Sequence, residues 1–337
     1  MKLDFQTLGE DLSQVPAIVG AAERAGYDGY WSAETKHDPF LPHVLAAEHS
    51  ERIELGTGIA VAFARSPMTV AHTAWDLQAQ SGGRFILGLG SQIKPHIVMR
   101  FSMPWSRPAA RMREFVEALL AIWEAWQTGH RLQFRGEFYT HALMTPFFDP
   151  GPIATERPKV FIAAVGPKMI EVAGRVCDGL LAHGFSTVRY AEDVIVPTIE
   201  AALTESGRKR SEFQLSQPVF VVTGADDDEV AVSRASVRQQ IAFYGSTPAY
   251  RGVLDHHGWG DLQTELHAMS KRGEWLAMAD LIDDEILDAF AVVAPPYRAG
   301  VAIRERYGHI ADRVSFYTKP DGHGPAVMAE LIRGVKG

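Results

Sequence analysis

Short apolar runs alternate with longer amphipathic stretches along most of the chain. The runs are apolar almost throughout, which is typical of strands in a parallel sheet that is covered on both faces. Between them, apolar residues recur every three to four positions, as in helices with one buried face. The predicted strands lie at residues 3–6, 27–34, 53–63, 85–90, 159–166, 178–185, 214–224 and 313–317.

The eight strand–helix steps favour a closed (β/α)8 TIM barrel, of the α/β class, over an open, doubly wound sheet. We expect a single domain over residues 1–337. Insertions at the C-terminal mouth of the barrel are expected around 92–106, 131–157 and 245–290. Groups that carry chemistry in such barrels lie where the strands end, so candidate residues are sought there.

The second insertion is rich in aromatic residues, proline and glycine. Its FRGEFY segment predicts a tight hairpin with Arg135-Gly136 at the turn. Phe147 and Phe148 follow in an irregular stretch. Together with Trp105 they are expected to form a lid or pocket wall, and a dimer interface or core packing are the alternatives.

Composition and charge narrow the classes of partner. The 337 residues carry 33 Lys and Arg against 41 Asp and Glu, a net charge of −8, with no block of basic residues that would hold nucleic-acid phosphates. The hydrophobic share of 46% is that of a packed globular protein. No apolar run has the length of a signal peptide or a membrane span. We therefore expect a cytoplasmic protein that binds a small molecule, with no nucleic-acid or membrane partner.

Cysteine and histidine usage argues against a metal centre. Cys177 is the single cysteine, so an intrachain disulfide is excluded, and its apolar context predicts a buried thiol rather than a nucleophile. The histidines show no HExxH or other recognisable ligand spacing. Neither a GxSxG elbow nor a Walker motif occurs. The sequence predicts no metal.

Polar residues gather where the second and third strands end. Glu34, Thr35 and His37 belong to a run of five polar residues that follows an apolar Tyr-Trp pair after two intervening residues. A carboxylate and an imidazole at a barrel mouth can supply hydrogen bonds or transfer protons, but a solvated loop accounts for the same residues equally well. After the third strand, Arg65 precedes Pro67 at a helix start, either as an anion ligand or as a surface or ion-pair residue.

Glycine and short polar residues end the fourth strand. GLGSQ brings Gly90, Ser91 and Gln92 to the mouth. The dinucleotide fingerprint is excluded because the third glycine and the later acidic residue are missing. Glycine at this place would let a flat ligand approach the backbone, and a simple tight turn is the alternative.

The fifth and sixth strands end with chemistry suited to an anion. Gly166-Pro167 stands at a predicted helix start, where free backbone N–H groups form a phosphate cradle with Lys168 as a counter-charge. His183-Gly184 repeats the arrangement one strand later. A helix start without any ligand remains the alternative at both places.

Five longer stretches carry a family resemblance. They are AAERAGYDGYWSAE, IELGTGIAVAFARSP, SGGRFILGLG, RMREFVEALLAIW and PKVFIAAVGPKMIEVAGRVCDGLLAHG. Together they resemble the luciferase-like monooxygenase superfamily, specifically its branch of oxidoreductases that use the deazaflavin coenzyme F420. FMN-dependent relatives share the same skeleton. The resemblance implies a (β/α)8 barrel with an insertion over its mouth, usually a homodimer, in which the tricyclic ring of the cofactor lies at the C-terminal ends of the strands.

The resemblance also implies catalytic roles. The acidic position of the family after the second strand falls on Glu34, which would contact the cofactor. Thr35 falls where some relatives have a catalytic histidine, so His37 is the candidate replacement for that imidazole. Glu34, His37 and Gln92 are thus the candidates for ring polarisation or proton delivery.

Further cofactor contacts follow from the same mapping. A non-prolyl cis peptide that supports the ring from behind would fall on Gly58-Ile59. The remaining candidates are Gly90 and Ser91 at the ring or ribityl chain, backbone N–H groups of Ala164, Val165 and Gly166 at the phosphate, and His183 and Gly184 alongside.

These observations lead to one functional hypothesis and two alternatives. The hypothesis is an oxidoreductase that transfers a hydride between coenzyme F420 and a small organic substrate. The first alternative is an FMN-dependent monooxygenase that needs a separate flavin reductase. The second is a barrel that binds the cofactor without catalysis.

Overall fold

The computed structural model describes residues 1–9, 11–317 and 323–337. Parallel strands form a closed barrel in which each strand pairs with the next one along the chain and the last pairs with the first. The barrel strands are β1 (Lys2–Thr7), β2 (Gly29–Ser32), β3 (Glu54–Thr57), β5 (Phe85–Gly90), β8 (Lys159–Ala164), β9 (Gly179–Ala182), β10 (Gln214–Val222) and β12 (Arg313–Phe316). The predicted (β/α)8 barrel is confirmed.

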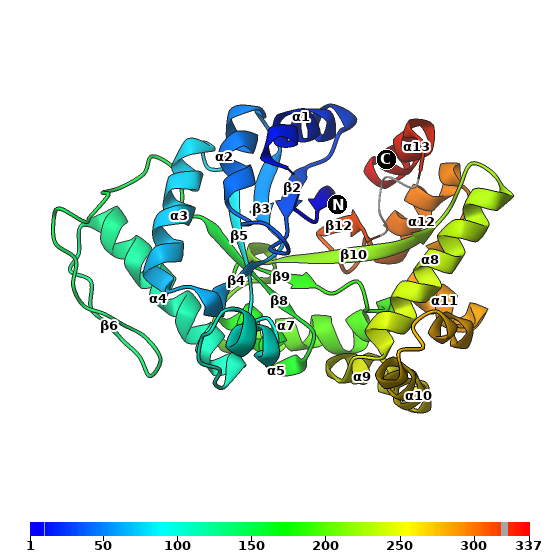
Figure 1. Ribbon diagram of the computed structural model, residues 1–337. Helices are drawn as coiled ribbons and strands as arrows, with labels where there is room; N and C mark the ends of the chain where they lie inside the picture. The colour runs from blue at the N-terminus through cyan, green and yellow to red at the C-terminus, as the bar shows by residue number, and fades with distance from the viewer. Residues whose placement is uncertain (10, 318–322) are drawn as a thin grey trace.

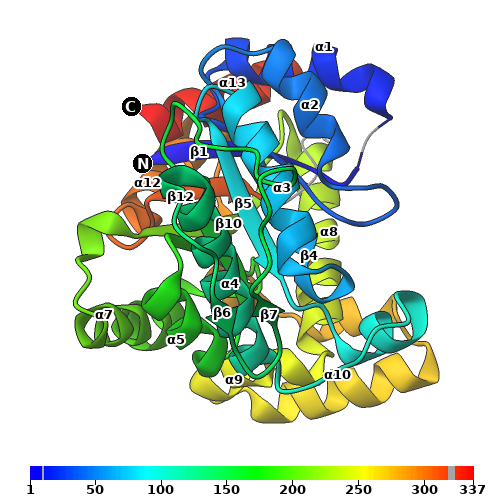
Figure 2. The ribbon, with the colours of Figure 1, turned by 90° about the vertical axis from the view of Figure 1, so that its left-hand side faces the viewer.

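Helices surround the barrel on its outer side (Figure 1). Most of them begin at a proline, whose fixed φ suits the first turn of a helix. The outer helices are α1 (Val15–Ala25), α2 (Leu41–Glu48), α3 (Pro67–Gln80), α4 (Pro108–Thr128), α5 (Pro167–Val176), α7 (Val196–Glu205), α12 (Pro296–Tyr307) and α13 (Pro325–Lys336). The C-terminal helix α13 packs against α12 and β1, which brings the two ends of the chain to the same side of the barrel (Figures 1 and 2).

The barrel interior holds its own apolar layer. Trp31, Ile86, Phe161 and Leu181 come from four different strands and are buried against one another. They are separate from the larger core between strands and helices because successive side chains of a strand point to opposite faces. This layer closes the barrel below its C-terminal mouth, so any ligand must bind above it.

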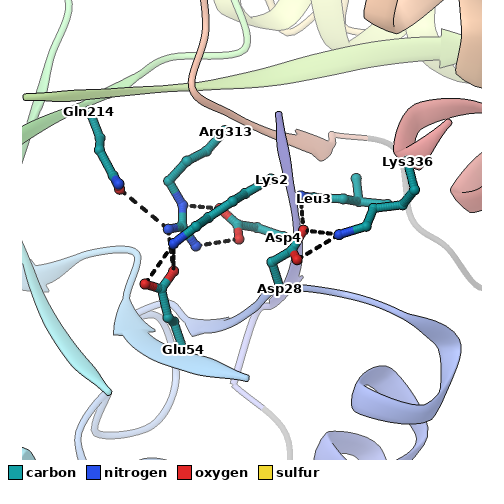
Figure 3. Close-up of polar contacts among 8 residues, drawn as sticks. All are labelled: Lys2, Leu3, Asp4, Asp28, Glu54, Gln214, Arg313 and Lys336. Atoms are coloured by element: carbon teal, nitrogen blue, oxygen red, sulfur yellow. Dashed lines mark hydrogen bonds and ion pairs between the residues drawn. The ribbon is translucent and has the colours of Figure 1, made fainter. Parts of the chain in front are cut away.

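Below that layer, the base of the barrel holds a charged network (Figure 3). Arg313 is fully buried and donates two hydrogen bonds to Asp4, at 2.8 Å from Nε and 2.6 Å from Nη2. It also pairs with Glu54, which Lys2 Nζ contacts at 2.7 Å. Burial opposes the charge of Arg313, but the carboxylates of Asp4 and Glu54 outweigh it and raise the pKa of the guanidinium.

The third barrel strand contains a bulge that faces the mouth. Gly56 pairs with Ile86, and Ala60 of the short strand β4 (Ala60–Val61) pairs with Leu89, so four steps along one chain oppose three along the other. The peptide bond between Gly58 and Ile59 within this bulge is cis, as the family resemblance implied.

The second insertion lies on the outer side of α3 and α4 and not over the mouth. Strands β6 (Phe134–Arg135) and β7 (Thr140–His141) form the predicted hairpin, but the turn is at residues 136–139 rather than at Arg135-Gly136. The buried Glu114 of α4 explains the shift, because its carboxylate accepts the N–H groups of residues 137, 138 and 139 at 2.6–2.8 Å. Figure 1 accordingly shows β6 beyond α4 at the edge of the molecule.

Hydrogen bonds from α3 hold the part of this insertion that follows the predicted lid residues. Trp75 and Gln78 of α3 donate to the carbonyls of Gly151 and Glu156, which keeps the returning segment on the helices. Phe147 and Phe148 are 89% and 65% exposed and contact each other edge to face. Neither is a core residue. Trp105 of the first insertion instead meets Phe63 edge to face at 6.0 Å, so a lid or pocket wall formed by these three residues stays a prediction.

The long insertion after β10 packs across one side of the mouth. It contains α8 (Asp227–Gly245), α9 (Arg251–His256), α10 (Gly260–Arg272) and α11 (Asp284–Phe290), and a shorter helix α6 (Val188–Tyr190) follows β9. A short strand that the sequence did not predict, β11 (Ala291–Val293), extends the sheet beside β10. Phe290, the last residue of α11, stacks on Phe185, 4.6 Å between ring centroids, and joins the insertion to the end of β9.

Candidate functional site

Glycines of β3 and β5 make one side of the mouth smooth. A Cβ atom on Gly58 would lie 3.6 Å from Trp31, in ordinary contact, whereas one on Gly90 would come within 2.7 Å of the Ile59 side chain. Gly88 admits no Cβ at all, because the carbonyl oxygen of Thr57 occupies that position. This side of the mouth therefore presents backbone and the partly buried Ile59, a surface suited to a flat ligand.

Glu34 is a buried carboxylate that is held through one of its two oxygens. Its side chain is 6% exposed, and Oε2 accepts hydrogen bonds from Val61 N–H and from Arg65 Nη1, both at 2.7 Å. Arg65 continues to Asp38 at 3.2 Å and lies over the ring of Phe40. Of the two interpretations of Arg65, the ion-pair residue is confirmed. The cluster ties the loop after β2 to the loop after β4.

Thr35 joins three loops at the mouth. Its hydroxyl donates to the carbonyl of Leu8 after β1, and its own carbonyl accepts from Arg100 Nη2 at 2.7 Å. Arg100 ends the short π-helix of the first insertion, where Ile97 is buried and Met99 is 79% exposed. Because Arg111 of α4 also holds Pro104 O at 2.7 Å, this insertion is anchored at both ends.

The two other catalytic candidates lie apart from this cluster. His37 is exposed and lies beside Gly9, so it belongs to the rim of the mouth. Gln92 has a positive φ of 55°, and its side-chain oxygen accepts the N–H of Ile93 at 3.1 Å. The Ser91 hydroxyl donates to Gln92 O at 3.2 Å. Both residues following β5 are therefore held in a tight turn at the strand end.

Ala164, Val165 and Gly166 lead from β8 into α5. Gly166 is the N-cap of α5 in an extended conformation, and nothing lies within 4 Å of the place where its Cβ would be. Among the described residues, no acceptor is recorded for the backbone N–H groups of Gly166 and Lys168. Free donors at a helix N-terminus favour an anion, and Lys168 is exposed beside them.

His183 and Gly184 are covered by aromatic residues. The His183 ring stacks on Tyr250 at 4.7 Å and meets Tyr244 edge-on at 4.6 Å. A Cβ on Gly184 would come within 2.7 Å of the Tyr317 ring, so glycine is needed there for packing. Burial lowers the pKa of His183 to about 4, so the imidazole is neutral near pH 7.

Sequence reasoning missed the tyrosines of this cluster. Tyr244 and Tyr250 lie in and after α8, inside an insertion without a motif, and only their proximity in the folded chain connects them with Tyr317. The one available signal was the position of Tyr317 at the end of a predicted strand. Arg100 and Arg111 anchor the first insertion, but no motif or position in the sequence marks them as functional.

The described residues offer neither a metal site nor a membrane-spanning helix. Across the residues that the structure describes, no group of three or more His, Cys, Asp or Glu side chains could hold a metal ion. None of the described helices is both long and apolar enough to cross a membrane. Cys177 is fully buried, and burial raises the pKa of its thiol, as expected of a structural cysteine.

Several known proteins resemble this chain in sequence or in fold. The uncharacterized protein Rv1360 of Mycobacterium tuberculosis is 58% identical over 314 residues, which cover 93% of this chain and 92% of that protein. The 5,10-methylenetetrahydromethanopterin reductase of Archaeoglobus fulgidus is 27% identical over 82% of this chain and 81% of its own length. The coenzyme F420-dependent tetrahydromethanopterin reductase of Methanopyrus kandleri has the same fold, with a TM-score of 0.78 at 20% identity, over 99% of this chain and 97% of that one. The family model for luciferase-like monooxygenases matches residues 3–313, and the chain therefore belongs to the luciferase-like monooxygenase family.

Proposed function

We propose that this protein is an oxidoreductase that transfers a hydride between coenzyme F420 and a small organic substrate. The observation that carries the proposal is the open N-cap of α5. Gly166 there leaves free backbone donors at the same barrel mouth that β3 and β5 line with glycine. A phosphate and a flat ring on one ligand match these two features.

The residues present fit such a cofactor. The N–H groups of Gly166 and Lys168 would hold the phosphate, and Ala164 and Val165 would shape the approach to it. Gly58-Ile59 and Gly90 would lie against the ring, with Ser91 beside it. Once bound, the deazaflavin supplies a carbon centre that gives or takes a hydride.

The protein's own side chains would hold the loops around the cofactor and border the site. Glu34 has its Oε2 committed to Val61 and Arg65, so it would fix the loops around the ring as well as contact the cofactor. Thr35 would have the same part through Arg100. His37 and Gln92 would contact the substrate side of the mouth, where His37 is open to solvent. His183 and Gly184 would border the site, with Gly184 against the ring of Tyr317. A homodimer is part of the proposal, and light scattering would measure it.

Titration with the purified cofactor tests the proposal. F420 should bind with quenching of its fluorescence, more tightly than FMN, and reduced F420 should be oxidised in the presence of substrate without consumption of oxygen. Tighter binding of FMN with oxygen uptake would establish the monooxygenase alternative instead. Binding of F420 without turnover on any tested acceptor would indicate a barrel that only carries the cofactor.

A matched pair of variants tests the cradle. Gly166→Ala places a methyl group where nothing else lies, so the fold should be unchanged while F420 binds about tenfold more weakly, the equivalent of one charge-assisted hydrogen bond. Gly324→Ala makes the same change at the N-cap of α13, which is also extended and open. Equal F420 affinity in both variants would remove the α5 cradle from the proposal.

A further inference from the structure

A chain of hydrogen bonds crosses the mouth from β9 to α8. The backbone N–H of Phe185 donates to Nδ1 of His183 at 3.0 Å. A nitrogen that accepts a hydrogen bond carries no proton, so the neutral imidazole has its proton on Nε2. Nε2 lies 3.3 Å from the hydroxyl of Tyr317 and donates to it. The backbone N–H of Phe185 thus decides which group donates and which accepts in the first two hydrogen bonds of the chain.

The next link ends on Tyr244. The Tyr317 hydroxyl oxygen accepts the hydrogen bond from His183 Nε2. Its own O–H group donates a hydrogen bond to the hydroxyl oxygen of Tyr244 at 2.8 Å. The proton of Tyr244 must then point elsewhere, and among the described residues no acceptor for it is recorded. Tyr244 is partly exposed, so its O–H group is a donor that the protein orients but does not use.

Both inner members of the chain face the barrel axis. His183 continues the alternation of β9 in which Leu181 points into the interior, and Tyr317 continues that of β12 from the interior Arg313. Tyr317 also meets Phe220 edge to face at 5.1 Å between ring centroids. The chain thus lies at the mouth, on the side opposite the glycines of β3 and β5.

We propose that the Tyr244 hydroxyl binds the oxygen of a carbonyl substrate and protonates it, with Tyr317 and His183 as positioning residues. This inference rests on the proposed function. The reduced deazaflavin would supply the hydride that forms the new C–H bond at the carbonyl carbon, while the C=O π bond breaks and its electron pair takes the proton of Tyr244. The Tyr244 oxygen is held by the Tyr317 O–H and regains a proton from solvent. In reverse, an alcohol loses the same hydride and proton.

One tyrosine of the aromatic cluster lies outside the hydrogen-bond chain. Tyr250 stacks on His183 from the other side, and its hydroxyl has no recorded hydrogen bond among the described residues. Burial raises the pKa of Tyr250 to about 12, so both it and the imidazole stay neutral near pH 7. Tyr250 therefore packs in the same cluster without belonging to the chain, which makes it the matched control.

Kinetics test the inference with cyclohexanone and benzaldehyde as probes. F420 affinity is measured first, because a wild-type protein that does not bind F420 refutes the proposed function itself. With F420 bound, Tyr244→Phe should reduce kcat for oxidation of reduced F420 by about 100-fold or more, the usual effect of losing a general acid. Tyr317→Phe should reduce it less, and Tyr250→Phe should leave kcat and F420 affinity unchanged.

A spectroscopic readout separates a catalytic role from a structural one. The ¹³C carbonyl signal of labelled cyclohexanone, added to protein loaded with oxidised F420, should move downfield in the wild type and in Tyr250→Phe, and stay at its solution position in Tyr244→Phe. Retained kcat in Tyr244→Phe, or an equal carbonyl shift in it, overturns the inference and leaves the cofactor proposal standing. A wild type that binds F420 but neither shifts nor reduces either probe overturns it equally.

Discussion

Arg313 and Asp4 form a two-point ion pair between the last and the first strand of the barrel, with hydrogen bonds of 2.6 and 2.8 Å and both side chains shielded from solvent. The pair lies where β12 and β1 close the ring. The planar guanidinium contacts both carboxylate oxygens at once, whereas the ammonium group of a lysine would offer a point charge without this paired geometry. The contact therefore fixes the relative position of the two strands as well as balancing a buried charge.

Removing the guanidinium should therefore strongly destabilise the barrel. Arg313→Met leaves the buried carboxylate of Asp4 without a partner, and we expect a loss of about 3–5 kcal/mol in the free energy of unfolding. Urea denaturation measures it. The double variant Arg313→Met with Asp4→Leu should recover most of the loss, since no unpaired charge then remains at that point. A double variant as unstable as the single one would show that packing, and not the charge pair, accounts for the effect.

Glu114 should hold the second insertion on α4. Its carboxylate accepts three backbone N–H groups, so Glu114→Ala leaves these donors unpaired and should cost about 2–3 kcal/mol. Limited proteolysis should then cut first within residues 131–157. Glu117→Ala on the same helix is the control, because Glu117 is 40% exposed and pairs only with Arg113 among the described residues. Identical cleavage patterns in the two variants would contradict the assignment.

Stability should fall as the pH is lowered, because of His43. This side chain is fully buried, lies 2.8 Å from Ser32 Oγ, and has its pKa lowered by burial from the ordinary 6.5 to about 3. The unfolded chain therefore binds a proton that the folded chain refuses as the pH drops below about 6.5. The contribution of His43 to the free energy of unfolding is complete well above that pH and shrinks toward pH 3, by about 1.6 kcal/mol between pH 6.5 and 5.

Urea denaturation at a series of pH values between 7.5 and 5 measures this slope. His183, whose pKa is lowered to about 4, adds to it in the same direction. A His43→Gln variant has no proton to take up at this position, so its stability should depend less on pH over the same range. An unchanged slope in that variant would assign the pH dependence to other groups.

Thr57 should stabilise the contact between β3 and β5 near the mouth. Its buried hydroxyl donates to the carbonyl of Gly88 at 2.7 Å and accepts the N–H of the same residue at 2.9 Å. Thr57→Val keeps the shape and leaves both backbone groups unpaired, so we expect a loss of about 2–4 kcal/mol in the free energy of unfolding. Thr57→Ser retains the hydroxyl and should lose less than half as much. Equal losses would indicate that the methyl group matters and the hydrogen bonds do not.

Local patterns in the sequence determined the barrel itself. Eight apolar runs with amphipathic stretches between them were sufficient, because strands covered on both faces and helices with one buried face leave different periodicities. The same holds for the open N-cap at Gly166, which follows from a glycine and a proline next to each other at the end of a strand. The buried Cys177 likewise follows from its apolar neighbours.

Only the tertiary structure decided how side chains distant in sequence combine. The sequence places Glu34 at the end of a strand, but only the folded chain shows that its Oε2 is held by Arg65 and Val61. Tyr244 carries no sequence signal, yet it ends a hydrogen-bond chain with Tyr317, 73 residues away. Periodicity reports which face of an element is buried, but it contains no information on which polar groups meet across the barrel, because that depends on the closure of the ring and the path of its insertions.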